Sequence, residues 1–369
     1  MSTTEVKRPE RSVPKPVFTD AEAGSQEFPS SRSRSFNYFT PRKRRASVYE
    51  DVTIDVQPDP ERHLTQGWIY GFADGTSGYP KEWTELKSSD WHLFLDPNEE
   101  WEQTIYRNNA NVVRQISGNL ANAKAANAFA GWNRTWIDTV ARHVSAWAHA
   151  EHGLGMHVYT PAQRDAPTNM INNALAVGAL HKLRFGQDII LYNLQLSEDI
   201  EGFDGTAHKQ AWNEDEVWQG VRENVEQLTA TRDWAEAFFA TAVVFEPLVG
   251  ELFRSGFVMQ VAALQGDFVT PTLMGAGESD AAREQRGARA LFGMLGEDDE
   301  YGEANRATMQ SWLDAWTPRS VQAARRLQPI WSQISEKPVR FEDAFDRAVA
   351  RFEDLTSALS LSTPKELAR

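Results

Sequence analysis

The eight histidines of this 369-residue chain are the residues whose spacing could reveal a metal centre. In carboxylate-bridged metal sites of helical bundles, a Glu stands three residues before a His, so that both ligands project from one helix face. The histidines are His63, His92, His143, His149, His152, His157, His181 and His208. Three positions before them stand, in the same order, Pro60, Ser89, Val140, Ala146, His149, Leu154, Gly178 and Gly205. None is acidic, so the sequence predicts no catalytic residue and no metal ligand of this kind.

One group of histidines leaves a second interpretation open. His149, Glu151 and His152 lie within one turn of a predicted helix, and His157 follows nearby. An i, i+3 pair of histidines with a carboxylate can bind a transition metal. His side chains near a helix end also complement the helix dipole and cap free carbonyl groups, which is the more common role. An independent metalloenzyme that uses the His149/His152 cluster is therefore the alternative hypothesis.

The elements that must position these residues are predicted to be helices. Asp96-Pro97-Asn98-Glu99 has the residue types that cap and begin a helix. Apolar residues then recur at helical spacing, which predicts helices over 133–153, 166–199, 214–229, 233–246, 247–264, 278–293, 304–316, 317–331 and 341–352. Pro247 is expected to kink or divide the helix that contains it. Val52, Ile54 and Val56 alternate, which indicates a short strand or extended stretch.

We therefore expect an all-α protein in three parts. Residues 1–45 are predicted to be a flexible basic and aromatic arm, residues 46–95 a mostly irregular lead-in, and residues 96–360 the helical domain. Residues 1–50 carry ten Lys or Arg and six Asp or Glu, whereas the remainder carries 28 and 46. This acidic body disfavours nucleic-acid binding over most of the chain.

The arm is predicted to dock on a partner protein. Aromatic anchors beside arginines suit such a surface, and one stretch combines Phe36, Tyr38 and Phe39 with Arg42, Arg44 and Arg45. The same mixture could stack on single-stranded nucleic acid, as an adaptor would. A third alternative is that the arm folds back on its own body.

Several chemistries are disfavoured by composition and motifs. The chain has no cysteine, so it has no disulfide, thiolate metal site, iron–sulfur cluster or cysteine nucleophile of its own. The longest apolar run, residues 237–250, is too short to span a membrane and contains Glu246. With a polar, Pro-rich N-terminus, this predicts a cytoplasmic protein. No phosphate-binding loop, nucleophile elbow or complete dinucleotide motif occurs, so no flavin or NADH site is expected.

Two groups of acidic residues invite a structural explanation. Glu246 stands among apolar residues, and a buried acid needs a partner. We expect that partner to be an Arg from another helix or subunit. A second group, Asp188, Glu198, Asp199 and Glu201, could be paired carboxylates for acid–base chemistry, but a solvated helix end or ion pairs to arginines such as Arg184 are favoured.

Four stretches resemble a known family: Ser35–Pro41 with the basic run after it, Thr65–Gly71, Gly266–Pro271 and Met309–Pro318. Their order is similar to that in the hydroxylase small (β) subunit of bacterial soluble multicomponent di-iron monooxygenases, of the propane 2-monooxygenase type. No position here matches the family's ligand motif, so no catalytic residue carries over.

The resemblance implies a metal-free ferritin-like bundle with additional C-terminal helices. It also implies a hydroxylase α (large) subunit that holds the di-iron centre, a second copy of this chain in an α2β2-type assembly, and a regulatory protein. A reductase with FAD and an iron–sulfur cluster would supply electrons from NADH. The reaction implied is O₂-dependent hydroxylation of a short alkane, propane to 2-propanol. This chain would then be a non-catalytic subunit that stabilises the α subunit and forms the dimer core.

Overall fold

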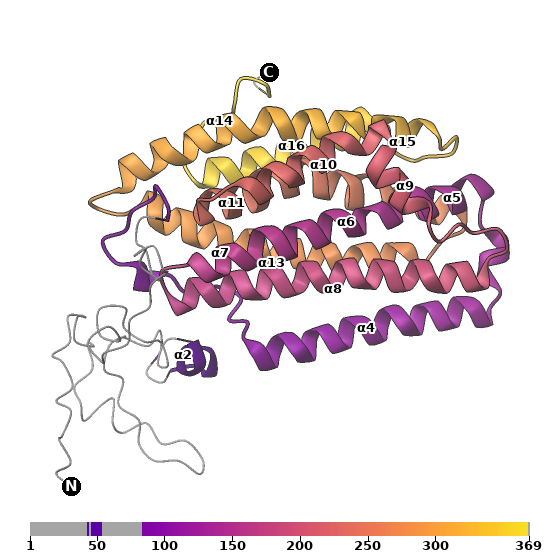
Figure 1. Cartoon of the computed structure of the whole chain (residues 1–369), viewed down its shortest axis with the longest axis horizontal. Coiled ribbons are helices and arrows are strands. Elements are labelled where there is room, and N and C mark those ends of the chain that lie inside the picture. Colours follow the sequence, from indigo (N-terminus) through magenta and orange to yellow (C-terminus); the bar gives the residue numbers. More distant parts are fainter. Residues whose placement is uncertain (1–42, 44–45, 54–82, 368–369) are drawn as a thin grey trace, which may run out of the picture.

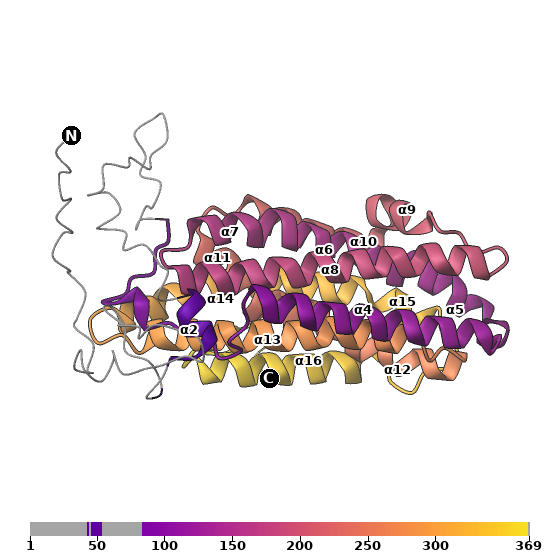
Figure 2. The ribbon, with the colours of Figure 1, turned by 90° about the horizontal axis from the view of Figure 1, so that it is seen from below.

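The computed structural model describes residue 43 and residues 46–53 and 83–367. In this part of the chain all regular structure is helical, which confirms the all-α prediction. The longest helices lie along one axis in two perpendicular views (Figures 1 and 2), and they are α4 (Glu102–Ala125), α8 (Asn169–Asp199), α13 (Thr270–Gly296), α14 (Gly302–Arg326) and α16 (Phe341–Ala358). No helix within the described ranges is both long enough and apolar enough to cross a bilayer.

Two further rods of the bundle are composite. The first covers residues 134–165 as α5 (Arg134–Thr139), η4 (Val140–Val144), α6 (Ser145–Gly153), η5 (Leu154–Tyr159) and α7 (Thr160–Asp165). The second covers residues 234–261 as α11 (Trp234–Phe239), η6 (Ala240–Gly250), η7 (Leu252–Val258) and α12 (Met259–Val261). The segments η4, η5, η6 and η7 are π-helical. Such wider turns inside helices are frequent at functional sites.

Three predicted breaks in helices were wrong. Pro247 lies inside η6, where the π-helical hydrogen bonds already depart from the usual pattern, and the rod continues through it. Helix α14 continues through Pro318. Gly153 does not end its helix either, because its backbone is helical and it lies against Val225, whose Cγ1 would be 2.7 Å from an added Cβ atom. Glycine at 153 permits close packing.

Two predicted starts also differ from the structure. Asp96–Glu99 forms a turn, in which Asp96 accepts a hydrogen bond from the Asn98 amide at 3.0 Å, and α4 begins only at Glu102. The expected strand near Val52 is instead the helix α2 (Val48–Thr53), while Ile54 and Val56 lie outside the described residues. Ser47 and Glu50 cap α2 reciprocally, and this capping box outweighs the brief alternation.

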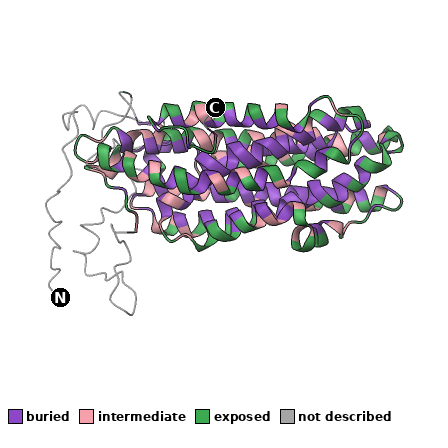
Figure 3. Ribbon diagram, turned by 90° about the horizontal axis from the view of Figure 1, so that it is seen from above, coloured by how far each residue is buried: buried purple, intermediate pink, exposed green. Residues whose placement is uncertain are grey.

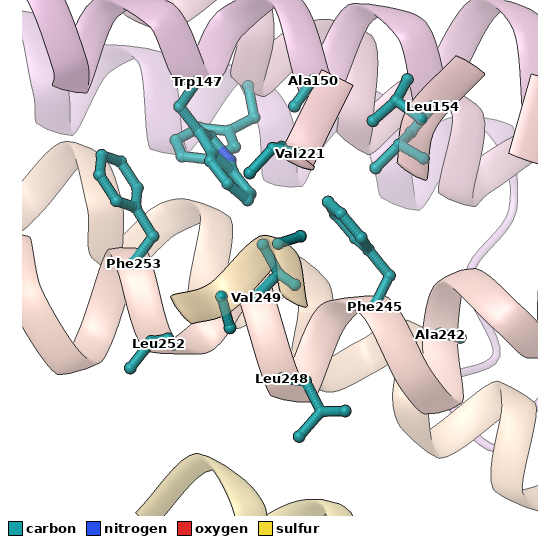
Figure 4. Packing of buried hydrophobic residues seen from close by; sticks show 14 of the residues in the cluster. Trp147, Ala150, Leu154, Val221, Ala242, Phe245, Leu248, Val249, Leu252 and Phe253 are labelled. Atoms are coloured by element: carbon teal, nitrogen blue, oxygen red, sulfur yellow. The ribbon is translucent and has the colours of Figure 1, made fainter. Parts of the chain in front are cut away.

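The second rod forms the centre of the core. All eleven residues of η6 are buried, and η6 packs against α14, α16 and α13. Buried residues gather on the inward sides of the helices (Figure 3). Between the two rods the Trp147 ring stacks on Phe245 and Phe253, with centroids 6.2 and 5.2 Å apart (Figure 4). These contacts place much of the aromatic surplus in the core of the chain.

Helix α8 lies between the first rod and α13 and packs against both. Glycines make the approach close: an added Cβ at Gly277 of α13 would be 2.3 Å from the ring of Phe185, and one at Gly178 would be 2.9 Å from the ring of Tyr159. Shorter helices cover the remaining sides and ends, namely α9 (Ala207–Glu214), α10 (Glu216–Ala230), α15 (Gln328–Ser332), η2 (Trp91–Leu93), η3 (Ala128–Gly131) and η8 (Ala262–Gln265). The bundle fold is ferritin-like, as the resemblance implied.

Candidate functional site

Ionisable side chains from five helical segments meet inside the bundle. They are Glu151 of α6, Lys182 of α8, Glu246 of η6, Arg254 of η7 and Glu284 of α13. Each of these side chains is at most 6% exposed. Burying five ionisable groups is costly unless they are paired and hydrogen-bonded, so their arrangement must provide partners. We call these five residues the central ionic network.

Lys182 lies where three carboxylates converge. Its ammonium group donates a hydrogen bond to Glu246 Oε1. The same Nζ atom is 3.3 Å from Glu284 Oε2 and 3.6 Å from Glu151 Oε2. The three acids come from three different helical segments. A single positive charge therefore links α8 to both rods and to α13.

Arg254 supplies the second positive charge. Its Nη2 atom donates to Glu246 Oε2 at 2.6 Å, its Nη1 atom to Glu151 Oε1 at 3.3 Å, and its Nε atom to Glu278 Oε1 at 2.7 Å. The guanidinium group also lies over the Trp147 ring, 5.5 Å from the centroid. The Trp147 indole donates to Glu151 Oε1 at 2.6 Å. Each of the three nitrogen atoms of this guanidinium group thus donates a hydrogen bond to a carboxylate.

The prediction that Glu246 pairs with an arginine is confirmed, but the location of that arginine differs. Arg254 stands eight residues further along the same rod, and the partner from another helix is Lys182. Between Glu246 and Arg254 stands Gly250, where an added Cβ atom would be 2.4 Å from Glu246 Oε2 and 2.9 Å from Arg254 Nη1. The glycine therefore leaves the space in which the pair meets.

The acids of the network differ in their protonation. Burial alone would raise the pKa of Glu246, but Arg254 and Lys182 outweigh it and lower that pKa to about 2. Burial raises the pKa of Glu284 well above its usual range, and the neighbouring Glu151 raises it further. Lys182 contacts Glu246 more closely than Glu284, so the 3.3 Å contact does not offset this burial. Glu246 is thus firmly ionised, while Glu284 tends to keep its proton.

A second polar group lies beside the network on α8 and α13. Arg184 forms ion pairs with Asp188 and Asp280, which confirms the favoured interpretation of Asp188 as an arginine partner. His181 lies 3.7 Å from Glu100 Oε2 and 4.0 Å from Asp280 Oδ1. Burial lowers the pKa of His181 despite these acids, so the ring is neutral at pH 7.

A cavity of about 30 Å³ separates the two polar groups, and Glu100, Glu151, Tyr159, His181, Lys182 and Glu284 are among its lining residues. Within the described structure, Glu284 Oε1, Tyr159 Oη and His181 Nε2 make no hydrogen bond. Buried polar atoms are usually paired, often with water, and this volume suits one water molecule. The three atoms therefore are buried polar groups on residues that line this cavity.

The structure does not bring the His149/His152 cluster together around a metal. His149 Nε2 is 2.9 Å from Nδ1 of His208, the His152 ring meets the His157 ring edge-on at 6.0 Å, and Glu151 points into the network. In the described ranges no group of three or more His, Cys, Asp or Glu is arranged to hold a metal ion. The point where three carboxylates meet is taken by Lys182.

The arm residues Phe36, Tyr38, Phe39, Arg42, Arg44 and Arg45 lie outside the described residues. Their role as an interface therefore stays a prediction, as does the division into 1–45, 46–95 and 96–360. Sequence reasoning missed Lys182, Arg254 and Glu284. The available signal was the same one that singled out Glu246, a charged residue within an apolar helical run, and it applies to Lys182 in Ala179-Leu-His-Lys-Leu183.

The chain belongs to the family of methane/phenol/alkene hydroxylases, because the model of that family matches residues 68–299. The fold agrees: phenol hydroxylase from Pseudomonas sp. OX1 superposes with a TM-score of 0.70 over 86% of this chain and 92% of that one, at 19% identity.

Within this family the chain is similar to small (beta) subunits of hydroxylase components. The chain is 57% identical to the hydroxylase component small subunit of propane 2-monooxygenase from Rhodococcus jostii (strain RHA1), over 97% of both chains. It is 27% identical to the methane monooxygenase component A beta chain of Methylococcus capsulatus, over 84% of this chain and 82% of the relative. The resemblance found in the sequence, to hydroxylase small subunits of the propane 2-monooxygenase type, is thereby confirmed.

Proposed function

We propose that this chain is the non-catalytic small subunit of the hydroxylase in a cytoplasmic, NADH- and O₂-dependent monooxygenase that converts propane to 2-propanol. The near full-length similarity to propane 2-monooxygenase small subunits supports the assembly and the substrate. The observation that carries the non-catalytic role is the central ionic network. In this network the positive charges that pair with the buried acids are side chains of the chain itself, Lys182 and Arg254.

The residues of the network do not fit the di-iron centre that the family implies. Such a centre takes four inward carboxylates and two histidines, each His three residues after a Glu. Three residues after Glu151, Glu246 and Glu284 stand Leu154, Val249 and Gly287. Moreover, Lys182 and Arg254 already form ion pairs with these acids, and a metal ion there would lie against both positive charges. We therefore assign the iron to the large subunit, and FAD, the iron–sulfur cluster and the NADH site to the reductase.

Exposed apolar side chains support a role in assembly. Leu180, Leu191 and Leu194 of α8 and Tyr106 and Val113 of α4 are between 40% and 60% exposed. The α8 and α4 helices lie side by side. Such residues on neighbouring helices suit a surface that another chain covers. We propose the large subunit and a second copy of this chain as the partners, with the regulatory protein docking on the assembled hydroxylase.

Co-expression with the large subunit tests this proposal. We expect one complex on size-exclusion chromatography, with iron present only when the large subunit is present. If this chain purified alone carried stoichiometric iron, the non-catalytic role would be wrong.

The arm is tested in the same complex. Deletion of residues 1–45 should weaken association of the subunits, because a wrapping arm buries much area per residue. Replacing Phe36, Tyr38 and Phe39 together by Ala should reproduce most of that loss. Replacing Arg42, Arg44 and Arg45 by Lys keeps the charge and should weaken association less than the loss of the three aromatic rings. Unchanged assembly after the deletion would contradict docking by the arm.

A further inference from the structure

We infer that Phe268 and the uncharged surface around it, at the end of the bundle where α13 begins, form the contact between two copies of this chain. The inference rests on the proposed assembly and deepens it by naming the surface that the second copy covers. Phe268 is 73% exposed, more than any other large apolar side chain in the described part of the chain. Single exposed apolar residues are common on protein surfaces, so the setting of this ring must decide its role.

The turn that carries Phe268 is fixed from inside the bundle. Asp267 is fully buried, and its Oδ1 atom accepts hydrogen bonds from the backbone N–H groups of Val269 and Thr270 at 2.8 and 2.9 Å. Its Oδ2 atom accepts one from the Trp136 indole at 2.8 Å. Val269 is buried as well, so both neighbours of Phe268 face inward and its ring is held outside. A side chain on a fixed backbone loses less conformational entropy when another surface covers it.

Two uncharged stretches of the chain meet at this turn. Residues 255–277 contain a single acid, which is buried, and residues 115–133 contain a single charge, that of Lys124. The stretches are joined where the Asn133 N–H group donates to the Gln265 carbonyl oxygen at 3.1 Å. Exposed residues within them include Ala121, Ala126, Ala130, Ala263 and Leu264. Depletion of charged residues around an aromatic side chain is the composition of an interface core.

The charge of the chain favours a second copy as the protein that covers this surface. The formal net charge is −14, so two copies repel each other wherever their acidic surfaces meet. In a two-fold contact a patch meets itself, so any charge on it would face the same charge. The exposed Tyr106 and Val113 of α4 stand beside the exposed Arg107 and Arg114, which would oppose such a contact. The surface around Phe268 has no comparable obstacle.

The test uses the hydroxylase formed by co-expression with the large subunit. Native mass spectrometry counts the copies of each subunit, and light scattering over a dilution series gives the dissociation constant between the two halves. Phe268→Asp removes the ring and places an acid on each copy. We expect it to raise that dissociation constant on the order of 30-fold or more and to release halves with one large and one small subunit. Phe268→Tyr keeps the ring and should preserve the assembly.

Leu93→Asp is the matched control. Leu93 is 65% exposed, and Ser89, four residues earlier, donates to Asp298 just beyond the far end of α13. The control should leave the assembly intact. Leu264→Asp repeats the test at a second exposed position of the same surface and should also release halves.

Three results would overturn the inference. They are an unchanged assembly with Phe268→Asp and Leu264→Asp, loss of the large subunit in place of separation into halves, and equal separation with Leu93→Asp. All three leave the proposed subunit role standing, because the unchanged chain still binds the large subunit. If the unchanged chain formed no complex with the large subunit, the proposed function would be wrong, and this inference with it.

Discussion

Two neighbouring residues of α6, Glu151 and His152, belong to very different regions. Glu151 faces inward and contacts Lys182, Arg254 and the Trp147 indole. His152 is exposed and meets the ring of His157 at the surface. By residue type the histidines were the better candidates for metal chemistry. In the structure, however, the side chain of α6 that is held by several buried charged partners is Glu151 and not a histidine.

Burial decides how the polar side chains of the two regions must be held. In the interior each charge is removed from water, so it persists only because partners surround it. On the outside water screens charges, and His152 and His157 meet each other edge-on, with ring centroids 6.0 Å apart. His149 lies deeper, and burial lowers its pKa to about 4, with smaller contributions from His208 and His152. The His149–His208 contact at 2.9 Å is therefore a hydrogen bond between neutral rings at pH 7.

The largest expected effect comes from Arg254→Met. The change keeps the volume approximately but leaves Glu246, Glu151 and Glu278 without their shared donor. Breaking a buried ion pair by removing one partner costs about 3–5 kcal/mol. We expect a loss of that size in the free energy of unfolding, measured with urea. Arg222→Met, which removes the exposed pair with Glu226, is the control and should cost about 0.5 kcal/mol or less. Similar losses of unfolding free energy in both variants would show that the buried ion pairs stabilise the chain no more than the exposed pair does.

Gly250→Ala should have the next largest effect. Alanine is normally the better helix residue by about 1 kcal/mol, but its Cβ atom would crowd Glu246 and Arg254. We expect a net loss of about 1–2 kcal/mol, because overpacking and displacement of the ion pair outweigh the helix propensity. Gly118 of α4 has open space around it, so Gly118→Ala should instead stabilise the chain. A gain in stability at both positions would show that Gly250 has no role in the pair.

Glu284→Gln should change the pH dependence of stability more than its value at pH 5. The pKa of Glu284 is higher in the folded chain than the usual 4.5 of a glutamic acid. Its stabilising contribution to the free energy of unfolding is therefore fully present below pH 4.5 and is lost as the pH rises through the folded-state pKa. Gln cannot lose a proton. Relative to the unchanged chain, the variant should therefore gain about 1 kcal/mol or more in the free energy of unfolding between pH 5 and pH 8. Parallel pH profiles for the two chains would indicate that Glu284 ionises normally.

Part of this structure could be predicted from the sequence. Helical periodicity predicted the all-α fold, and no histidine has an acidic residue three positions before it, so the Glu-x-x-His ligand motif does not occur. The need of Glu246 for an arginine followed from its apolar surroundings. The π-helical segments could not be predicted, because they arise from packing and have the same apolar pattern as an α-helix. The rods also continue through Gly153 and Pro247, where the sequence had indicated a helix end and a kink or division.

The central network was harder to predict than any one of its members. Its residues come from positions 151, 182, 246, 254 and 284, and they meet only because α8 lies between the first rod and α13. Periodicity predicts that a residue lies on a buried face but does not predict which charges on other helices it will face. Glu284 is, in sequence alone, an unremarkable charged residue on a long helix, and the apolar run around Lys182 does not show which acids that lysine meets. Their significance depends on three-dimensional convergence.

The smallest expected effect is that of His152→Ala. The ring is exposed and its described contact is edge-on with His157, so its removal should change the free energy of unfolding by about 0.5 kcal/mol or less. His157→Ala should do the same, and the double variant should be additive within that margin if the rings contribute little together. Neither change should alter the iron content of the complex with the large subunit. Loss of iron with His152→Ala alone would revive the metal-binding interpretation of this cluster and would place functional chemistry on the outer side of α6.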